Sequence, residues 1–258
     1  MSRDVAWLKG LYESFVKPAA DFLVEYRDEG GLPHPSYDLW EERRGVHTFT
    51  AMTVVLGLRG AAHLALAVGD DGTLSYAIAA EEVLRALRSR LTDHERGVLL
   101  RGLRAEPGAA LQPDHTPDAS LLLGLCLGVI DPQDPIAVNT AARLSRELWV
   151  EGEIGGLARY PGDYYFRQTE SVPGNPWIIC TLWLAQFQLM SARSPADLLE
   201  PIGTMRWAMR HAAPTGVLAE QLHPHTGAHL SVSPLTWAHS EFVKTALMLQ
   251  DASEALGK

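Results

Sequence analysis

Carboxylates and aromatic side chains are concentrated between positions 37 and 42 of the sequence. Asp38, Glu41 and Glu42 lie beside Tyr37 and Trp40. Aromatic rings stack on the C–H faces of pyranose sugars, and carboxylates accept hydrogen bonds from sugar hydroxyls. A carboxyl group enclosed by aromatic side chains also keeps its proton to a higher pH, so it can act as an acid near neutrality. These residue types therefore indicate sugar chemistry.

A plainer interpretation of the same stretch is an acidic surface loop with one half-buried tryptophan. Composition alone favours that interpretation, because perturbed carboxyl groups are much rarer than solvated ones. Pro33, Pro35 and the pair Gly30–Gly31 come just before the acids, and proline restricts both its own backbone and that of the residue before it. We expect a rigid loop that carries the acids to the mouth of a helical scaffold.

The scaffold is predicted to be helical and to form one domain over residues 1–258. Apolar residues recur at helical spacing in eight segments: 4–26, 45–68, 74–91, 119–128, 136–150, 177–190, 195–211 and 236–255. Pro18 should kink or split the first segment. The segment 45–68 is apolar all round and is expected to be buried on every side, whereas 74–91 has a single apolar stripe. This alternation fits an inner and an outer ring of helices.

Two long loops separate the later helices, and a third region lacks a helical pattern. Residues 92–117 are expected to form short strands or irregular loops. The loop 152–176, with five aromatic residues from Tyr160 to Trp177, is expected to be functional, as is the loop 214–234. Trp7, Trp149, Trp183 and Trp207 lie in helical patterns and are expected to pack in the core.

Composition limits the choice of partners. The 258 residues carry a formal charge of −9, which argues against nucleic acid or an anionic membrane as partner. The longest apolar runs look short of a membrane span, and the first residues contain no apolar signal-peptide core. We expect a cytoplasmic protein. Cys126 and Cys180, the two cysteines, are expected to be free thiols.

Three pairs of motifs lie in the loops that precede helices. They read YDLWEER with GVHTFT, GGLARYPGDYY with GNPW, and LAEQLHPHTG with SPLTWAH. Together, and in this order, they resemble the catalytic loops of glycoside hydrolase family 15, which holds glucoamylases, glucodextranases and some bacterial trehalases. The resemblance covers essentially the whole chain. It implies an all-α fold, an (α/α)6 toroid-like barrel with the active site in the loops at one end.

The resemblance also implies a role for individual residues. Glu41, the first Glu of LWEE, would be the general acid, and Glu220 of the AEQ motif would be the general base. The residues expected to contact or wall the sugar site are Asp38, Trp40, Glu42, Arg159, Tyr160, Asp163, Trp177 and Trp237. An inverting hydrolase needs its two carboxyl groups about 6.5–9.5 Å apart, with a water between. They must come from different loops, as Glu41 and Glu220 do.

The implied function is an inverting, exo-acting glycoside hydrolase that releases glucose from α-linked oligosaccharides or polysaccharides, without a cofactor. A trehalase of the same family is an alternative, and so is a non-catalytic carbohydrate-binding or regulatory module. Relative to the family, the N-terminal part of the barrel is expected to be missing, leaving about eight of twelve helices. An open barrel face would expose apolar surface and favour self-association.

Plainer interpretations remain for two other groups of residues. His223, His225, His229 and His239 could suggest a metal site, but Pro224 and Gly227 favour turn and hydrogen-bonding roles, and we expect no metal. Without the resemblance, Arg159 and Asp163 would be interpreted as a surface ion pair.

Overall fold

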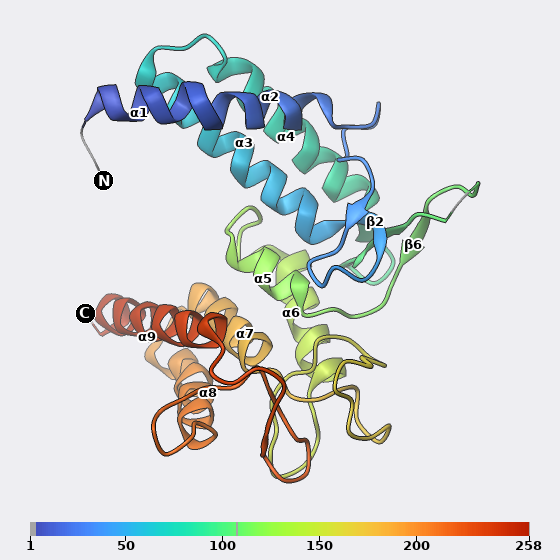
Figure 1. Ribbon diagram of the computed structural model, residues 1–258, viewed down its shortest axis with the longest axis vertical. Helices are drawn as coiled ribbons and strands as arrows, with labels where there is room; N and C mark the ends of the chain where they lie inside the picture. Colours follow the sequence, from blue (N-terminus) through green and yellow to red (C-terminus); the bar gives the residue numbers. More distant parts are fainter. Residues whose placement is uncertain (1–3, 107, 258) are drawn as a thin grey trace. The chain divides into compact units, whose positions relative to one another are not determined.

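The computed structural model describes residues 4–106 and 108–257. The chain divides into two compact units, residues 1–115 and 116–258. In Figure 1 the first unit holds α1 to α4 and the second holds α5 to α9. That the two units form a single domain stays a prediction.

The first helical segment of unit 1 contains a wide turn in front of its proline. α1 (Val5–Leu11), the π-helical turn η1 (Tyr12–Val16) and α2 (Lys17–Glu25) follow one another without a break. Proline has no N–H and its ring collides with the carbonyl four residues earlier in an α-helix. Here the Lys17 N–H donates to the Tyr12 carbonyl, five residues back, and this wider turn accommodates Pro18. The predicted irregularity at Pro18 is therefore a π-helical turn.

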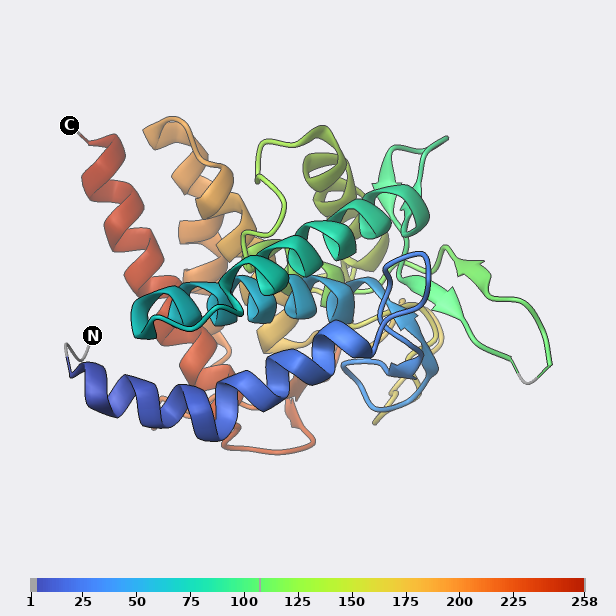
Figure 2. The ribbon, with the colours of Figure 1, turned by 90° about the horizontal axis from the view of Figure 1, so that it is seen from above.

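Helix α3 (Thr48–Val68) contacts both the α1–α2 segment and α4 (Thr73–Arg90), as Figure 2 shows. Met52, Val55 and Leu58 are fully buried, but Leu56 and Leu66 are 44% and 69% exposed. The prediction that this helix is buried on every side is therefore wrong for part of its surface. With 21 residues and a mean hydropathy of 1.6, α3 is also long and apolar enough to cross a membrane, contrary to the expectation from its sequence.

An exposed apolar face also runs along the first helical segment. Trp7, Phe15 and Phe22 are 57%, 67% and 57% exposed. The prediction that Trp7 packs in the core is wrong, because the described residues leave its ring on the surface.

A small antiparallel sheet holds the acidic loop of unit 1. Its strand order is β1 (Ser36–Tyr37), β2 (Arg44–His47), β5 (Gly102–Arg104) and β6 (Gln112–Asp114), and β3 (Thr92–Asp93) pairs separately with β4 (Val98–Leu99). Short strands in 92–117 were predicted and are confirmed. The predicted helix start at Gly45 is wrong, because residues 45–47 pair with β5 and the helix begins at Thr48.

Unit 2 is built around α7 (Ile178–Ser191). Every residue of α7 from Ile178 to Phe187 is buried, and the helix contacts α5 (Ser120–Cys126), α6 (Pro135–Leu148), α8 (Leu199–Arg210) and α9 (Thr236–Leu256). A 3-10 turn, η2 (Pro195–Leu198), leads into α8, and the strands β7 (Gln221–Leu222) and β8 (His229–Leu230) form a hairpin before α9. A helix that is apolar all round is buried all round when neighbours surround it. Each of the eight predicted helical segments is present.

Candidate active site

Asp38 holds the turn between β1 and β2 in unit 1. Its backbone N–H donates to the Arg43 carbonyl at 2.9 Å. Its Oδ1 accepts hydrogen bonds from the backbone N–H groups of Glu42 (2.9 Å) and Arg43 (3.3 Å), and its Oδ2 pairs with Arg43 Nη1 at 3.4 Å. Asp38 is only 9% exposed. The side chain predicted to wall a sugar pocket therefore shapes the turn.

The neighbouring glutamates Glu41 and Glu42 occupy different environments. Glu41 has a positive φ of 58° and is exposed, whereas the Glu42 side chain is 13% exposed and pairs with Arg43 Nη1 at 2.9 Å. A left-handed backbone is uncommon for residues other than glycine and is often found at functional sites. The aromatic enclosure expected around the acid is not present among the described residues, because Glu41 is exposed. Trp40, next to it, is half-buried.

His47 lies under this turn at the end of β2. Its Nε2 is 3.1 Å from the Arg43 carbonyl, and the residue is 8% exposed. Burial lowers the pKa of His47, while Asp38 and the carbonyl of Arg43 act in the opposite direction. The sequence did not indicate this residue as part of the site, although it belongs to the GVHTFT motif.

In unit 2 the polar residues of the middle loop form a buried cluster. Arg159 Nε and Nη2 donate to Asp163 Oδ2 and Oδ1 at 2.8 and 2.7 Å, a bidentate pair. The Arg159 guanidinium lies 4.6 Å from the ring centre of Trp177, 5.1 Å from that of Tyr160 and 5.4 Å from that of Tyr165. The cation is therefore flanked by aromatic rings that stabilise it.

Burial excludes the plainer alternative for Arg159 and Asp163, an ion pair on the protein surface. Arg159, Asp163, Tyr160 and Trp177 are 5%, 1%, 1% and 3% exposed. Tyr165 is 36% exposed, and its backbone N–H donates to Asp163 Oδ1 at 3.0 Å. Tyr165 was not singled out from the sequence, and the aromatic run at 164–166 was the signal that could have found it.

Backbone hydrogen bonds connect the middle loop to the segment that carries Glu220. Isolated bridges pair Leu157 with Trp177 and Trp177 with Gln221. The Ile178 N–H donates to the Glu220 carbonyl at 3.2 Å, and the Leu222 N–H donates to the Pro176 carbonyl at 2.9 Å. The second and third motif pairs, more than forty positions apart at this point, are thus brought side by side.

One carboxylate oxygen of Glu220, Oε2, is buried and accepts no hydrogen bond from any described residue. Its backbone is held on both sides, by the bond to Ile178 and by donation of its own N–H to the Val232 carbonyl at 2.9 Å. A buried carboxylate oxygen without a protein donor is rare and calls for an explanation, such as a role in chemistry.

Trp237 stands in the first turn of α9, next to the Glu220 segment. The Leu235 N–H donates to the Leu218 carbonyl at 3.1 Å, and the Leu218 N–H donates to His239 Nε2 at 3.1 Å. The ring of Trp237 is half-buried. Of the six site residues predicted in unit 2, five are therefore linked by contacts or backbone pairing, and Trp237 lies on the segment bonded to them.

The loop histidines make hydrogen bonds, as predicted. His223 Nδ1 accepts from the His225 N–H at 3.1 Å, and His229 Nε2 lies 2.7 Å from the His211 carbonyl. Within the described ranges, no group of three or more His, Cys, Asp or Glu side chains is arranged to hold a metal ion.

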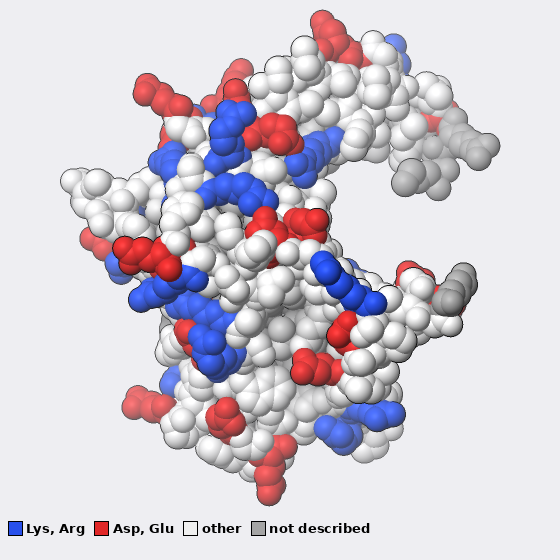
Figure 3. Space-filling model, turned by 180° about the vertical axis from the view of Figure 1, so that it is seen from behind, with Lys and Arg blue, Asp and Glu red and all other residues white. Residues whose placement is uncertain are grey.

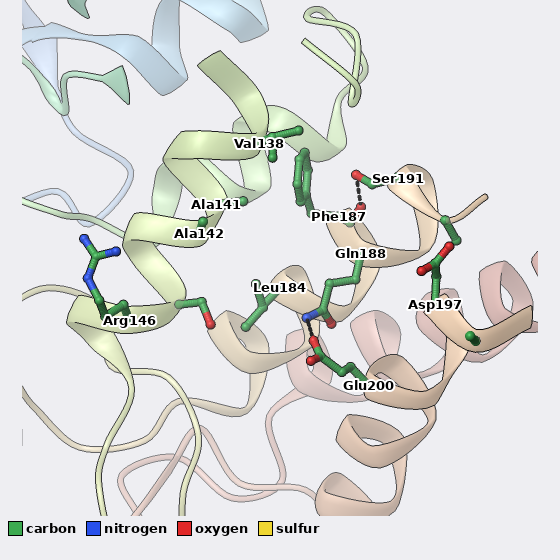
Figure 4. A pocket seen from close by; sticks show the side chains of 13 residues that line it. Val138, Ala141, Ala142, Arg146, Leu184, Phe187, Gln188, Ser191, Asp197 and Glu200 are labelled. Atoms are coloured by element: carbon green, nitrogen blue, oxygen red, sulfur yellow. Dashed lines mark hydrogen bonds between the residues drawn. The ribbon is translucent and has the colours of Figure 1, made fainter. Parts of the chain in front are cut away.

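A cavity of about 620 Å³ lies elsewhere in unit 2, between α6, α7 and α8 (Figure 4). Its lining includes Val138, Leu184 and Phe187, with Gln188 Nε2 donating to Glu200 Oε2 at 2.6 Å. None of the predicted site residues lines it.

Comparison with known proteins decides the family. Residues 8–203 match the sequence profile of Glycosyl hydrolases family 15. The chain belongs to glycoside hydrolase family 15. This confirms the resemblance inferred from the three pairs of motifs.

The family 15 relatives of this chain include proteins named for different activities. It is 30% identical over 223 residues to an uncharacterized glycosyl hydrolase of Methanocaldococcus jannaschii, a match covering 81% of this chain and 33% of the relative. It is 27% identical to a glucoamylase of a Clostridium species (90% and 35% covered) and 25% identical to a trehalase of Mycobacterium tuberculosis (85% and 30% covered). The chain spans about a third of the length of these relatives.

The family 15 fold is confirmed by solved structures. A bacterial glucoamylase complexed with acarbose superimposes with a TM-score of 0.75 at 23% identity, over 94% of this chain and 38% of that one. The predicted all-α class, with helices of a glucoamylase-type (α/α)6 barrel, is confirmed.

Proposed function

We propose that this chain carries the acid and the base of an inverting, exo-acting glycoside hydrolase that releases glucose from α-glucosides. Glu220 is the general base and Glu41 the general acid. The observation that carries this proposal is Glu220 Oε2, a buried carboxylate oxygen that accepts no hydrogen bond from the described residues. Such an oxygen can accept a proton from an attacking water, and the backbone bonds on both sides of Glu220 hold its position.

Glu41 suits the complementary role through its backbone. Glu41 has a left-handed backbone at φ 58°. Its N–H donates to the Asp38 carbonyl at 3.1 Å within the same turn, and the residue is exposed. Arg159, Asp163 and Trp177 would form a rigid floor below the sugar, and Tyr165 and Trp237, which are more exposed, would contact its faces.

Substitution of each glutamate tests the proposal. Glu41→Gln and Glu220→Gln should each lower kcat on maltose by about 10²–10⁴-fold, the usual contribution of a general acid or base. Both variants should remain folded and bind acarbose. Glu170→Gln, an exposed glutamate of the middle loop, is the matched control and should keep wild-type turnover. Near-wild-type turnover in either test variant would exclude that residue from its role.

The stereochemistry of the product tests inversion independently. Proton NMR during the first minutes of hydrolysis should show β-glucose appearing from an α-linked substrate, before mutarotation. Initial release of α-glucose would instead require a retaining mechanism, with carboxyl groups about 5–5.5 Å apart.

Trehalose is the alternative substrate, because one relative of this chain is a trehalase. Glucose release from trehalose, maltose and a longer α-glucan should be compared at equal concentrations. Preference for trehalose would replace the glucoamylase-type assignment. A folded protein that binds these sugars in calorimetry but cleaves none would indicate a non-catalytic carbohydrate-binding module.

Partners of other kinds are not expected, and a cytoplasmic location is part of the proposal. Basic and acidic side chains are interspersed on the face shown in Figure 3, and nucleic acid requires a continuous basic surface. Arg59 of α3 pairs with Glu81 of α4 at 2.7 Å. Placing charged side chains inside a bilayer is unfavourable in free energy, so this pair argues against α3 as a membrane span. We also propose that copies of this chain associate through the exposed apolar face of the α1–α2 segment.

A further inference from the structure

A buried polar group joins α7 and α9 in unit 2. Glu241 of α9 is 8% exposed, and Gln186 of α7 and Thr245 of α9 are both fully buried. Burying a carboxylate is unfavourable unless donors satisfy it. The role proposed above for the site does not use any of these three side chains.

Each oxygen of the Glu241 carboxylate has its own donor. Oε2 accepts from Gln186 Nε2 at 2.7 Å, and Oε1 accepts from the indole Nε1 of Trp237 at 3.2 Å. Gln186 Nε2 also donates to Thr245 Oγ1 at 3.0 Å, while Lys244 Nζ lies 3.8 Å from Oε2. Since one oxygen is held by α7, the other is presented to Trp237 in a fixed direction.

The Trp237 ring is held at a second point. Its ring centre lies 5.5 Å from that of Trp183, with 55° between the planes, and Trp183 is fully buried. A hydrogen bond at Nε1 and a fixed ring beside it leave the half-buried indole little freedom to rotate. The same turn of α9 is tied to the Glu220 segment through His239 and Leu218.

We propose that Glu241 is a positioning residue, which fixes the Trp237 indole as a wall of the sugar site beside Glu220. Gln186 acts through Glu241 by orienting its carboxylate. This inference rests on the proposed function, because it takes Trp237 as part of the sugar site. The carboxylate does not touch sugar itself.

A conservative variant is expected to preserve this arrangement. Gln186 Oε1 is buried and makes no hydrogen bond with the described residues. In Glu241→Gln, rotation of the Gln186 amide would turn this oxygen toward the new NH₂ group, and the remaining amide oxygen could still accept from Trp237. Glu241→Met keeps the side-chain length but removes both acceptors.

Fluorine NMR measures the orientation of Trp237 directly. The full chain labelled with 5-fluorotryptophan carries seven fluorines, one per tryptophan, and Trp237→Phe identifies the Trp237 signal. That signal should shift and broaden in Glu241→Met, keep its position in Glu241→Gln, and be unchanged in Glu254→Met, an exposed control on the same helix. An unchanged Trp237 signal in Glu241→Met would overturn the proposal. Glu241→Ala replaces Glu241→Met, with the same criterion, if the latter does not fold.

Kinetics separate positioning from a purely structural role. In Glu241→Met, kcat/KM on maltose should fall by about 10- to 100-fold, as expected for a displaced site residue. In the Trp237→Phe background the same substitution should have little further effect, and additive losses would contradict action through Trp237. A chain that neither binds acarbose nor releases glucose would end the proposed function. The fluorine signal would still decide whether Glu241 orients Trp237.

Discussion

Single carboxylates of this chain differ in the hydrogen-bond donors that the protein supplies to them. Asp38 accepts two backbone N–H groups and pairs with Arg43, and Asp163 receives a bidentate arginine. Glu220 keeps one buried oxygen that accepts from no donor in the described part of the chain. A carboxylate that the protein has saturated holds structure together, whereas one left unsatisfied can take a proton from water. Loss of activity on mutation of Asp38 or Asp163 would therefore reflect the fold as well as the site.

His47 links the acidic turn to the pH dependence of stability. Because burial lowers its pKa from 6.5, the folded protein binds a proton there less readily than the unfolded chain. Just below the unfolded value of about 6.5 the unfolded state therefore holds more protons, and the free energy of unfolding falls as the pH falls. The stabilising contribution is complete above this pH.

His47→Gln should remove this contribution. Urea unfolding between about pH 7 and about pH 5 should show a shallower loss of stability in the variant than in the wild type. His63→Gln, an exposed histidine on α3, should follow the wild-type profile. Parallel profiles for the wild type and His47→Gln would show that His47 does not titrate across this range.

At the scale of elements, the β2–β5 pairing supports the loop that carries Glu41. A Cβ added at Gly45 would lie 2.5 Å from the Leu103 carbonyl oxygen, and one added at Gly102 would press on the carbonyl of Val46. The two glycines allow the strands to approach closely. At Gly60, in the middle of α3, an added Cβ would instead meet open space.

Substitution by alanine should have opposite effects on stability at Gly45 and at Gly60. Gly45→Ala is expected to destabilise the protein by about 1–3 kcal/mol, the usual effect of overpacking, and to lower turnover by displacing the acidic turn. Gly60→Ala should stabilise it by about 0.5–1 kcal/mol through the helix propensity of alanine. Chemical denaturation measures both, and equal stability of Gly45→Ala and the wild type would show that the strand contact relaxes freely.

At the scale of the whole molecule, exposed apolar side chains lie on the first and last helical segments. Besides Trp7, Phe15 and Phe22, the last helix exposes Val243 and Leu247 at 56% and 57%. The net charge of −9 opposes association of copies, and salt screens that repulsion. Association should therefore grow with both protein concentration and ionic strength.

Sedimentation or light scattering measures this association. The mean mass should rise with concentration in 0.5 M salt more than in about 0.05 M salt, because the Debye length shrinks from about 14 Å to about 4 Å. Phe15→Glu combined with Phe22→Glu should lower the mass toward that of one chain. Leu74→Glu, which changes an exposed leucine at the start of α4, is the control. A constant monomer mass under all conditions would contradict the proposal.

Local periodicity was sufficient to predict the helical segments, because a 3.6-residue repeat is contained within each segment. The motifs were sufficient to indicate the family and the loops that carry Glu41, Arg159 and Glu220. The helix start at Thr48 could not be predicted, because β2 takes its hydrogen bonds from β5, more than fifty residues away. The wide turn that accommodates Pro18 was anticipated only as an irregularity.

The sequence by itself determined the types and order of the residues in this chain: acids beside aromatics, and apolar stripes at helical spacing. Only the tertiary structure decided which of these groups are buried and which have hydrogen-bond partners. It buried Arg159 against Asp163, exposed Trp7, and left Glu220 Oε2 without a donor among residues 4–106 and 108–257. Hydrogen-bond satisfaction and burial depend on partners that are distant in sequence, and folding alone brings these partners together.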